Sequence, residues 1–310
     1  MRVYTRISPI IIALTLTAGV TSCFTGIEST PKITASDVKR EKVTVSAEDE
    51  FLTDIAKEPL ESWSPGKQFF VTDSKINLIF GPSADNTAGL AGRYITFEGV
   101  RDVTSVTGEP VAEFTFRFPN GETAAYRSSK SIEEWKKQGS VDIPFTIEEK
   151  LIHDVAARIQ GHDYYILTPQ WYDTDDKARK GRKFVKVRVN KVLPGTTEYP
   201  VRLAMTDEKG EPFRLFMSVG RGLKAPRNFS SLMAFKDPRL KYPLITDAVW
   251  SKIINGEVAQ DMTQDECRLS LGSPAEIDRR PGYGYLYEIW SYENGVYLIF
   301  EDGLLRSFRR

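Results

Sequence analysis

Alternating apolar and polar positions in the middle of the chain predict short antiparallel strands. Phe114, Phe116 and Phe118 alternate with polar neighbours within residues 111–118, which is the period of a half-buried strand. The Pro-Asn-Gly sequence at 119–121 follows directly and predicts a hairpin turn. The pattern therefore predicts an antiparallel β unit in this part of the chain.

The same pattern recurs further along the chain. Residues 161–168 mirror residues 66–72, and residues 181–185 mirror residues 92–95. Each copy is expected to contain about five short strands separated by turns, which is typical of a small antiparallel barrel of the SH3-like kind. We therefore expect two such units in tandem. One continuous sheet that spans both units is the alternative.

After residue 246 the apolar period becomes that of helices. Thr246 or Asp247 is expected to cap a helix that carries apolar residues three and four positions apart through Ile254. Thr263 and Glu266 form a capping box, which predicts the start of a second helix. Three strands are expected after these helices, at 285–292, 296–300 and 304–308.

This last block resembles the SmpA/OmlA family of outer-membrane lipoproteins, which is also known as BamE. The matching segments are 262–266, 271–274, 288–292 and 297–303. The resemblance implies a two-helix, three-strand module over residues 244–310. In that family the module follows the lipid anchor closely, whereas here the two β units lie between them. The predicted fold class is therefore α+β and mostly β: two small SH3-like antiparallel barrels or sheets, followed by a BamE-like module.

The N-terminus has the order of an export signal. Basic residues at positions 2 and 6 precede an apolar stretch at 7–16, and small residues then lead to Cys23. The end of this signal resembles the lipobox of bacterial lipoproteins. That resemblance implies a diacylglycerol thioether on the Cys23 sulfur, cleavage before Cys23 and acylation of the new amino group. A plain secretory signal with an incidental cysteine is the alternative. A transmembrane helix is not expected, because the apolar run is interrupted and shorter than the roughly 20 residues of a membrane span.

These patterns divide the chain into a signal, a tether and three folded parts. Residues 1–22 are the expected signal. Residues 23–60 are the expected lipidated tether, because they are polar and charged and lack a sustained apolar period. The two β units are expected at 61–140 and 141–240, and the BamE-like module at 244–310.

Composition restricts the possible partners. The chain has 42 basic and 42 acidic residues, so electrostatic steering toward nucleic acid is not expected. It has two cysteines. If Cys23 carries lipid, Cys267 is the remaining thiol and no disulfide can form within the chain. A hydrophobic content of 41% is ordinary for folded domains.

No catalytic constellation, cofactor site or metal site is predicted. His153 and His162 are each followed by aspartate, but His162 takes the place of Lys67 in the repeat and is interpreted as a turn residue. The acidic segment 173–176 resembles the start of a calcium loop. The sixth and twelfth positions of that loop lack the required glycine and glutamate, so a solvated loop is the better interpretation.

A basic loop beside two aromatic residues is the candidate for an interaction site. The predicted interaction residues are Trp171, Tyr172, Arg179, Lys180 and Arg182. Aromatic and arginine side chains are enriched at binding hot spots, which favours this loop over an isolated basic run. Packing of the aromatic pair in the core of the β unit is the alternative.

The expected function is that of a membrane-anchored, non-enzymatic binding or scaffold lipoprotein of the Gram-negative envelope, in outer-membrane assembly or maintenance. The alternative is a cell-wall enzyme, or an enzyme regulator or inhibitor, that binds glycan or peptide. The expected partners are outer-membrane lipid, through acylated Cys23, and an envelope protein. By resemblance to bacterial lipoproteins, Phe24 in place of a retaining aspartate favours the outer membrane. The lack of an acid-rich stretch after Cys23 favours its periplasmic face.

Overall fold

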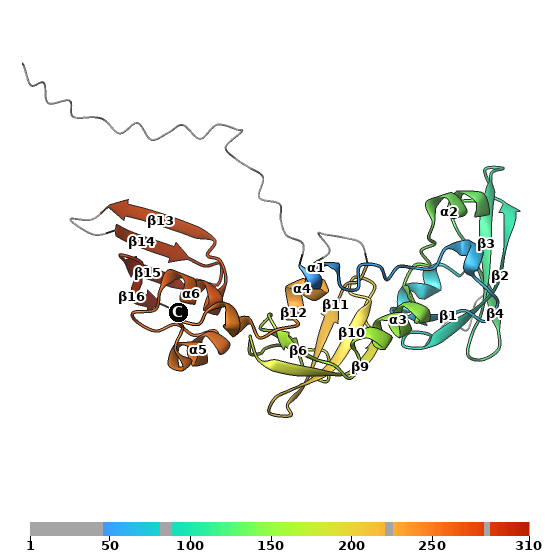
Figure 1. The fold of residues 1–310 in the computed structure, drawn as a ribbon. Coiled ribbons are helices and arrows are strands. Elements are labelled where there is room, and N and C mark those ends of the chain that lie inside the picture. The colour runs from blue at the N-terminus through green and yellow to red at the C-terminus, as the bar shows by residue number, and fades with distance from the viewer. Residues whose placement is uncertain (1–45, 81–88, 221–225, 282–285, 310) are drawn as a thin grey trace, which may run out of the picture. The chain divides into compact units, whose positions relative to one another are not determined.

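The computed structural model describes residues 46–80, 89–220, 226–281 and 286–309 of the chain. The predicted signal, Cys23 and residues 24–45 of the predicted tether lie outside these residues. The described part is mostly β, with three antiparallel sheets and six α-helices (Figure 1). None of the helices in this part has the length and apolar character that a membrane span requires.

The first sheet consists of β1 (Gln68–Val71), β2 (Tyr94–Thr104), β3 (Pro110–Arg117), β4 (Thr123–Arg127) and β5 (Thr146–Glu148). These strands lie in the order β4-β3-β2-β1-β5. The predicted alternation places Phe114 and Phe116 of β3 in the core, where both are fully buried. Trp63 packs against this core, with 5.0 Å between the ring centroids of Trp63 and Phe69. The strand predicted near residues 111–118 is therefore confirmed.

The second sheet consists of β6 (Asp163–Ile166), β7 (Gln170–Tyr172), β8 (Ala178–Lys180), β9 (Lys186–Pro194), β10 (Val201–Asp207), β11 (Pro212–Met217) and β12 (Met233–Ala234). The strands lie in the order β12-β6-β9-β10-β11-β7-β8. The helix α3 (Glu149–Ile159) packs against β9 and contributes Val155 and Ile159 to the core. Leu52 and Ile55, within the range predicted as a tether, are buried in the same core.

The two sheets do not follow one plan, so the predicted pair of SH3-like units is wrong. The sheets differ in the number and the order of their strands. The predicted repeat aligns Gly92 with Gly181, but these glycines have different roles. Gly92 has a φ of +81° and turns the chain before β2, whereas a Cβ on Gly181 would lie 2.0 Å from the ring of Trp171. Residues 181–185 form a connection and not a strand.

The C-terminal region ends in a four-stranded sheet, so the predicted two-helix, three-strand BamE-like module is also wrong. The strands β13 (Glu276–Pro281), β14 (Leu286–Ser291), β15 (Tyr297–Glu301) and β16 (Leu304–Arg309) pair in sequential order. The sequence does not predict β13, because most of its side chains are charged and show no apolar alternation. Pairing with β14 provides the missing interactions: Ile277 lies opposite Trp290, and Arg279 Nε donates to buried Glu288 at 3.2 Å.

Two short helices precede this sheet, namely α5 (Asp247–Ile254) and α6 (Gln264–Leu271). Thr246 caps α5, and Thr263 and Glu266 form the capping box of α6. Trp290 and Phe300 are fully buried in the core of this region. The remaining helices and turns are α1 (Ala47–Glu50), α2 (Ile132–Gln138), α4 (Phe229–Leu232), η1 (Leu60–Ser62), η2 (Ser74–Leu78) and η3 (Pro238–Lys241).

Candidate functional site

The predicted interaction residues lie on and beside the hairpin of β7 and β8, at one edge of the second sheet. Because side chains alternate along a strand, these residues face different sides of the sheet. Trp171 points into the core, where its ring stacks on Phe213 with 3.9 Å between the ring centroids. The Trp171 side chain is only 1% exposed. Trp171 therefore belongs to the core of the second sheet.

Arg179 and Arg182 are held by acidic residues of the same sheet region. Arg179 Nη1 donates to Glu211 at 2.6 Å, and Arg182 Nη2 donates to Asp207 at 2.5 Å. Burial opposes ionisation of the Asp207 carboxyl, but hydrogen bonds from backbone amides and from Arg182 outweigh it and lower its pKa. Lys180, by contrast, is exposed and lines a cavity of 680 Å³ together with Arg179. Two of the three predicted basic side chains thus form ion pairs with acidic residues of the same sheet region.

The outer face of the second sheet carries a surface that joins three arginines to three aromatic side chains. We name it the arginine–tyrosine surface, and it consists of Tyr172, Asp176, Tyr199, Arg202, Arg214, Phe216 and Arg227. Strand pairing brings these residues together: Arg214 lies opposite Tyr172, and Phe216 lies opposite Arg202. The rings of Tyr172 and Phe216 meet edge to face, with 4.9 Å between their centroids. Of the predicted interaction residues, Tyr172 is the one that belongs to this surface.

Asp176 joins two of the arginines. Its Oδ2 accepts a hydrogen bond from Arg202 Nη1 at 2.9 Å, and its Oδ1 accepts one from Arg214 Nη1 at 2.8 Å. The side chains of Arg202 and Arg214 are 25% and 24% exposed, so the sheet holds both guanidiniums in place while leaving part of each open to solvent. One carboxylate is therefore shared by two half-buried cations.

Arg227 lies between two tyrosine rings. Its Cζ is 5.7 Å from the centroid of Tyr172 and 5.8 Å from that of Tyr199. Its Nε donates to the carbonyl of Phe216 at 2.8 Å, and its Nη1 donates to Gln170 at 3.0 Å. These contacts fix the plane of the guanidinium. Cation–π contacts of this kind stabilise a partly desolvated arginine.

Two nitrogen atoms of this surface lack a hydrogen-bond acceptor. Within the described part of the chain, Nε of Arg202 and Nη2 of Arg227 are buried and make no hydrogen bond. Buried polar groups are usually paired, and an unpaired donor is energetically costly. Asp176 is shared by two of the three guanidiniums, so the arginines outnumber the carboxylate and the surface is suited to a further anionic group.

The chemistry of this surface is that of recognition. A guanidinium donates hydrogen bonds and stays charged, so it binds anions and does not exchange protons at neutral pH. The pKa of the Tyr199 phenol is raised, chiefly by its hydrogen bond with Glu198. The surface therefore presents charged donors and aromatic rings, which are the groups that dominate binding hot spots.

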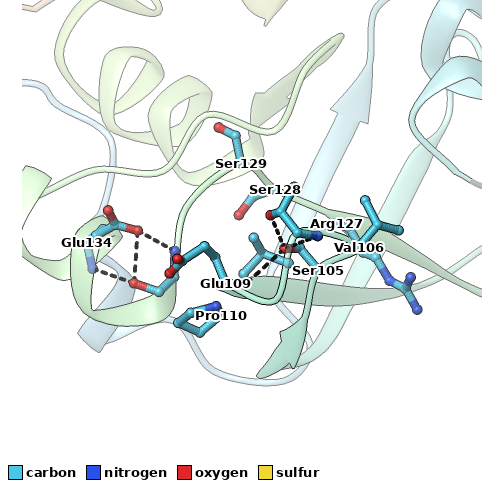
Figure 2. Close-up of a pocket in the computed structure, with 11 residues that line it drawn as sticks. Ser105, Val106, Glu109, Pro110, Arg127, Ser128, Ser129 and Glu134 are labelled. Carbon is cyan, nitrogen blue, oxygen red and sulfur yellow. Dashed lines mark hydrogen bonds between the residues drawn. The ribbon is translucent and has the colours of Figure 1, made fainter.

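A second, polar groove of 660 Å³ lies between the turn that joins β2 to β3 and the segment that leads to α2 (Figure 2). Several of its hydroxyls serve the fold. Ser105 Oγ accepts a backbone amide of its own turn at 3.2 Å, and Ser128 Oγ accepts the indole N–H of Trp135 at 2.9 Å. Ser131 and Glu134 form the capping box of α2. The arginine–tyrosine surface, which keeps unpaired donors, is therefore the stronger candidate site.

The remaining candidates from the sequence have local structural roles. The imidazole of His153 is 70% exposed and lies 3.8 Å from Glu149 on the same helix. Asp173 Oδ1 accepts the backbone amides of residues 175 and 177, so the acidic segment forms a hydrogen-bonded turn. Cys267 is buried, and burial raises the pKa of its thiol to about 12. Among the described residues, no group of three or more His, Cys, Asp or Glu side chains could hold a metal ion.

Sequence reasoning missed most of the arginine–tyrosine surface. The surface depends on three arginines that are far apart in the chain, namely Arg202, Arg214 and Arg227. They come together only when β10 pairs with β11 and the segment after β11 packs against that strand. One local signal was present. Arg202 stands between Val201 and Leu203, and an arginine at the polar position of an alternating strand faces outward.

Comparisons with protein families, curated proteins and solved structures found nothing that matches this chain.

Proposed function

We propose that this protein is a lipid-anchored, non-enzymatic binding protein of the Gram-negative envelope. In this proposal acylated Cys23 holds the chain in the outer membrane on its periplasmic side, and the folded part holds an envelope protein. The observation that carries the binding role is the arginine–tyrosine surface, where Arg202 and Arg214 share one carboxylate and Arg227 contacts two tyrosine rings.

The rigidity of this surface supports a binding role. Arg202 and Arg214 stand on paired strands, and Arg227 is fixed by Phe216 and Gln170. Ordering a long side chain on binding costs about 0.5–1.5 kcal/mol. Side chains that the free protein already holds avoid much of this cost. A partner can therefore gain affinity from these arginines without first ordering them.

The anchor would strengthen such binding. A membrane attachment and a tether confine the folded part to a thin layer, which raises its effective concentration toward any partner in the same layer. Modest affinity at the arginine–tyrosine surface is then sufficient. The anchor itself rests on the lipobox pattern that ends at Cys23.

Site-directed photo-crosslinking in intact cells tests the proposal. Ala204 lies opposite Arg214 on the outer face of the second sheet, so a benzoylphenylalanine at position 204 would reach a bound partner. We expect a discrete crosslinked species of higher mass. Replacing Arg202 and Arg214 together by glutamine should abolish that species, because the partner would lose its charged contacts.

A matched position on the first sheet provides the control. Ala125 of β4 lies opposite Thr115 and is half-buried like Ala204. Benzoylphenylalanine at position 125 should give no species of the same mass. A failure to crosslink at position 204, or an identical species at both positions, would contradict the proposed binding role.

A further inference from the structure

Asp176 is the one acidic member of the arginine–tyrosine surface, and it belongs to a loop rather than to the sheet. The loop joins β7 to β8, while Arg202 and Arg214 stand on β10 and β11. The Asp176 side chain is 33% exposed, more than the side chain of either arginine that it contacts. The sheet thus fixes the two cations, and a loop brings the anion to them.

The loop does not depend on the Asp176 carboxylate for its conformation. Asp173 Oδ1 accepts the amides of Asp175 at 2.8 Å and of Lys177 at 2.9 Å. The backbone of Asp173 also pairs with the carbonyl of Lys177 at 2.9 Å, and the Asp176 amide donates to the Asp173 carbonyl at 3.1 Å. Asp176 itself has a φ of +64°, a conformation that asparagine tolerates as well as aspartate does. The Asp176 side chain therefore contacts the arginines without being needed for the conformation of the loop.

One carboxylate does not satisfy this surface. It contacts Arg202 and Arg214, while Nε of Arg202 and Nη2 of Arg227 remain without acceptors among the described residues. A carboxylate accepts hydrogen bonds at two oxygens and can pair with an arginine through two parallel bonds. The side chains of Arg202 and Arg214 are about a quarter exposed, so further carboxylates can approach these two guanidiniums from solvent and add to the charge that Asp176 supplies.

We propose that Asp176 occupies the position at which a carboxylate of the partner protein binds. An acidic segment of that partner displaces Asp176 when it binds the arginine–tyrosine surface. This inference rests on the proposed binding function and names the chemistry of its partner. The group that already occupies the arginines is a carboxylate, which favours aspartate and glutamate side chains over other anions. The adjoining ring of Tyr172, which packs edge to face on buried Phe216, offers apolar contact to the residues that flank such carboxylates.

The inference predicts that removing the competing carboxylate strengthens binding. The probe is fluorescein-labelled hexaglutamate, titrated with the detergent-purified full-length chain and followed by fluorescence anisotropy. Asp176→Asn should tighten binding by about threefold to fivefold, because the ligand no longer displaces a partly exposed ion pair. Arg202→Gln combined with Arg214→Gln should weaken binding by roughly tenfold or more, because two charge-assisted hydrogen-bond sites are lost.

The second sheet contains its own control for net charge. Asp163 is also shared by two cations, Lys186 and Arg188, whose side chains are 53% and 57% exposed. Asp163→Asn removes the same charge from the same sheet, away from the arginine–tyrosine surface. Its hexaglutamate affinity should stay within about twofold of the wild-type value, because exposed pairs of this kind contribute little.

The outcomes separate the inference from the function on which it rests. If Asp176→Asn binds hexaglutamate no more tightly than wild type, or if Asp163→Asn tightens binding equally, the inference is wrong. If phosphatidylglycerol vesicles bind through the same arginines and hexaglutamate does not compete, the surface recognises lipid and the inference is wrong. A persistent crosslink at position 204 in either case would leave the proposed binding function standing.

Discussion

Each of the first two sheets has two arginines that share one carboxylate, and the two clusters are built in opposite ways. On the first sheet Glu113 stands on β3 with Arg101 and Arg127 on the neighbouring strands. The Glu113 side chain is 4% exposed, whereas Arg101 and Arg127 are 74% and 67% exposed. In the arginine–tyrosine surface the arginines are the more buried partners, and the carboxylate is the most exposed.

The difference in burial indicates a different role for each cluster. On the first sheet the two arginines cover a carboxylate that the fold has buried, so the cluster stabilises the sheet. On the second sheet the strands hold the arginines and a loop supplies the carboxylate. The two arginines can therefore exchange Asp176 for a carboxylate of the partner. The buried partner of an ion pair is the one that the structure cannot easily release, because an uncompensated buried charge is costly.

The largest expected effect is the loss of stability when Glu113 is removed. Glu113→Ala should lower the free energy of unfolding by about 1–2 kcal/mol, because the carboxylate accepts hydrogen bonds from two arginines. The expected loss is small because both arginines can return to solvent. Urea denaturation followed by circular dichroism would measure the change.

A second pair on the same sheet provides the control for Glu113. Glu98 accepts a hydrogen bond from Arg117 at 2.8 Å, and its side chain is 35% exposed. Glu98→Ala should change the free energy of unfolding by less than about 0.5 kcal/mol. Equal losses in the two variants would break the comparison, because burial would then not distinguish the two carboxylates.

The pH dependence of stability should show the same contrast. Hydrogen bonds from Arg127 and then Arg101 lower the pKa of the Glu113 carboxyl below its usual value of 4.5. Below pH 4.5 the unfolded chain therefore binds a proton at this site before the folded chain does. The contribution of Glu113 is complete above this pH and is lost as the pH falls through the folded-state pKa. Denaturation curves should show a shallower acid decline for Glu113→Gln than for wild type, and parallel declines would contradict this assignment.

The response to salt sharpens the comparison from the side of binding. The arginines of the arginine–tyrosine surface remain about a quarter exposed, so salt should screen their attraction for hexaglutamate. We expect the affinity to fall several-fold when the salt concentration rises from about 50 to about 200 mM. The same change should leave the free energy of unfolding nearly constant. An affinity independent of salt would point to contacts through the aromatic side chains alone.

The smallest expected effect is the stability change on Asp176→Asn. Because the loop is held by Asp173, the free energy of unfolding should change by less than about 0.5 kcal/mol. Thermal unfolding of the two proteins side by side would measure this difference. A loss as large as that of Glu113→Ala would mean that Asp176 is a structural residue and would remove the contrast between the two clusters.

Local patterns predicted some elements of the fold and missed others. The alternation around Phe114 and Phe116 is a property of adjacent residues, so it predicts β3 without knowledge of the partner strands. The strand β13 has no such pattern and depends on pairing with β14. The predicted repeat was wrong because similar local sequences around Gly92 and Gly181 meet different surroundings, a free turn in one case and the ring of Trp171 in the other.

The candidate site also has one part that local sequence predicted and another part that it missed. Tyr172 was predicted because a basic loop adjoins it, but the neighbouring Trp171 points to the opposite face and is buried. The basic charge near Tyr172 in sequence is largely paired at the sheet edge by Glu211 and Asp207. The cations beside Tyr172 are instead Arg214 of β11 and Arg227, which no local spacing connects to it.

The sequence by itself determined where the strand at Phe114 forms, because the alternation of apolar and polar side chains in a strand depends only on a few adjacent residues. It also contains the lipobox-like pattern at Cys23, on which the proposed anchor rests, and equal numbers of basic and acidic residues. Only the tertiary structure decided which strands pair, and therefore which carboxylate is buried and which arginines face outward. Strand order joins residues far apart in the chain, and the burial that results determines whether an ion pair stabilises the fold or remains open to a partner.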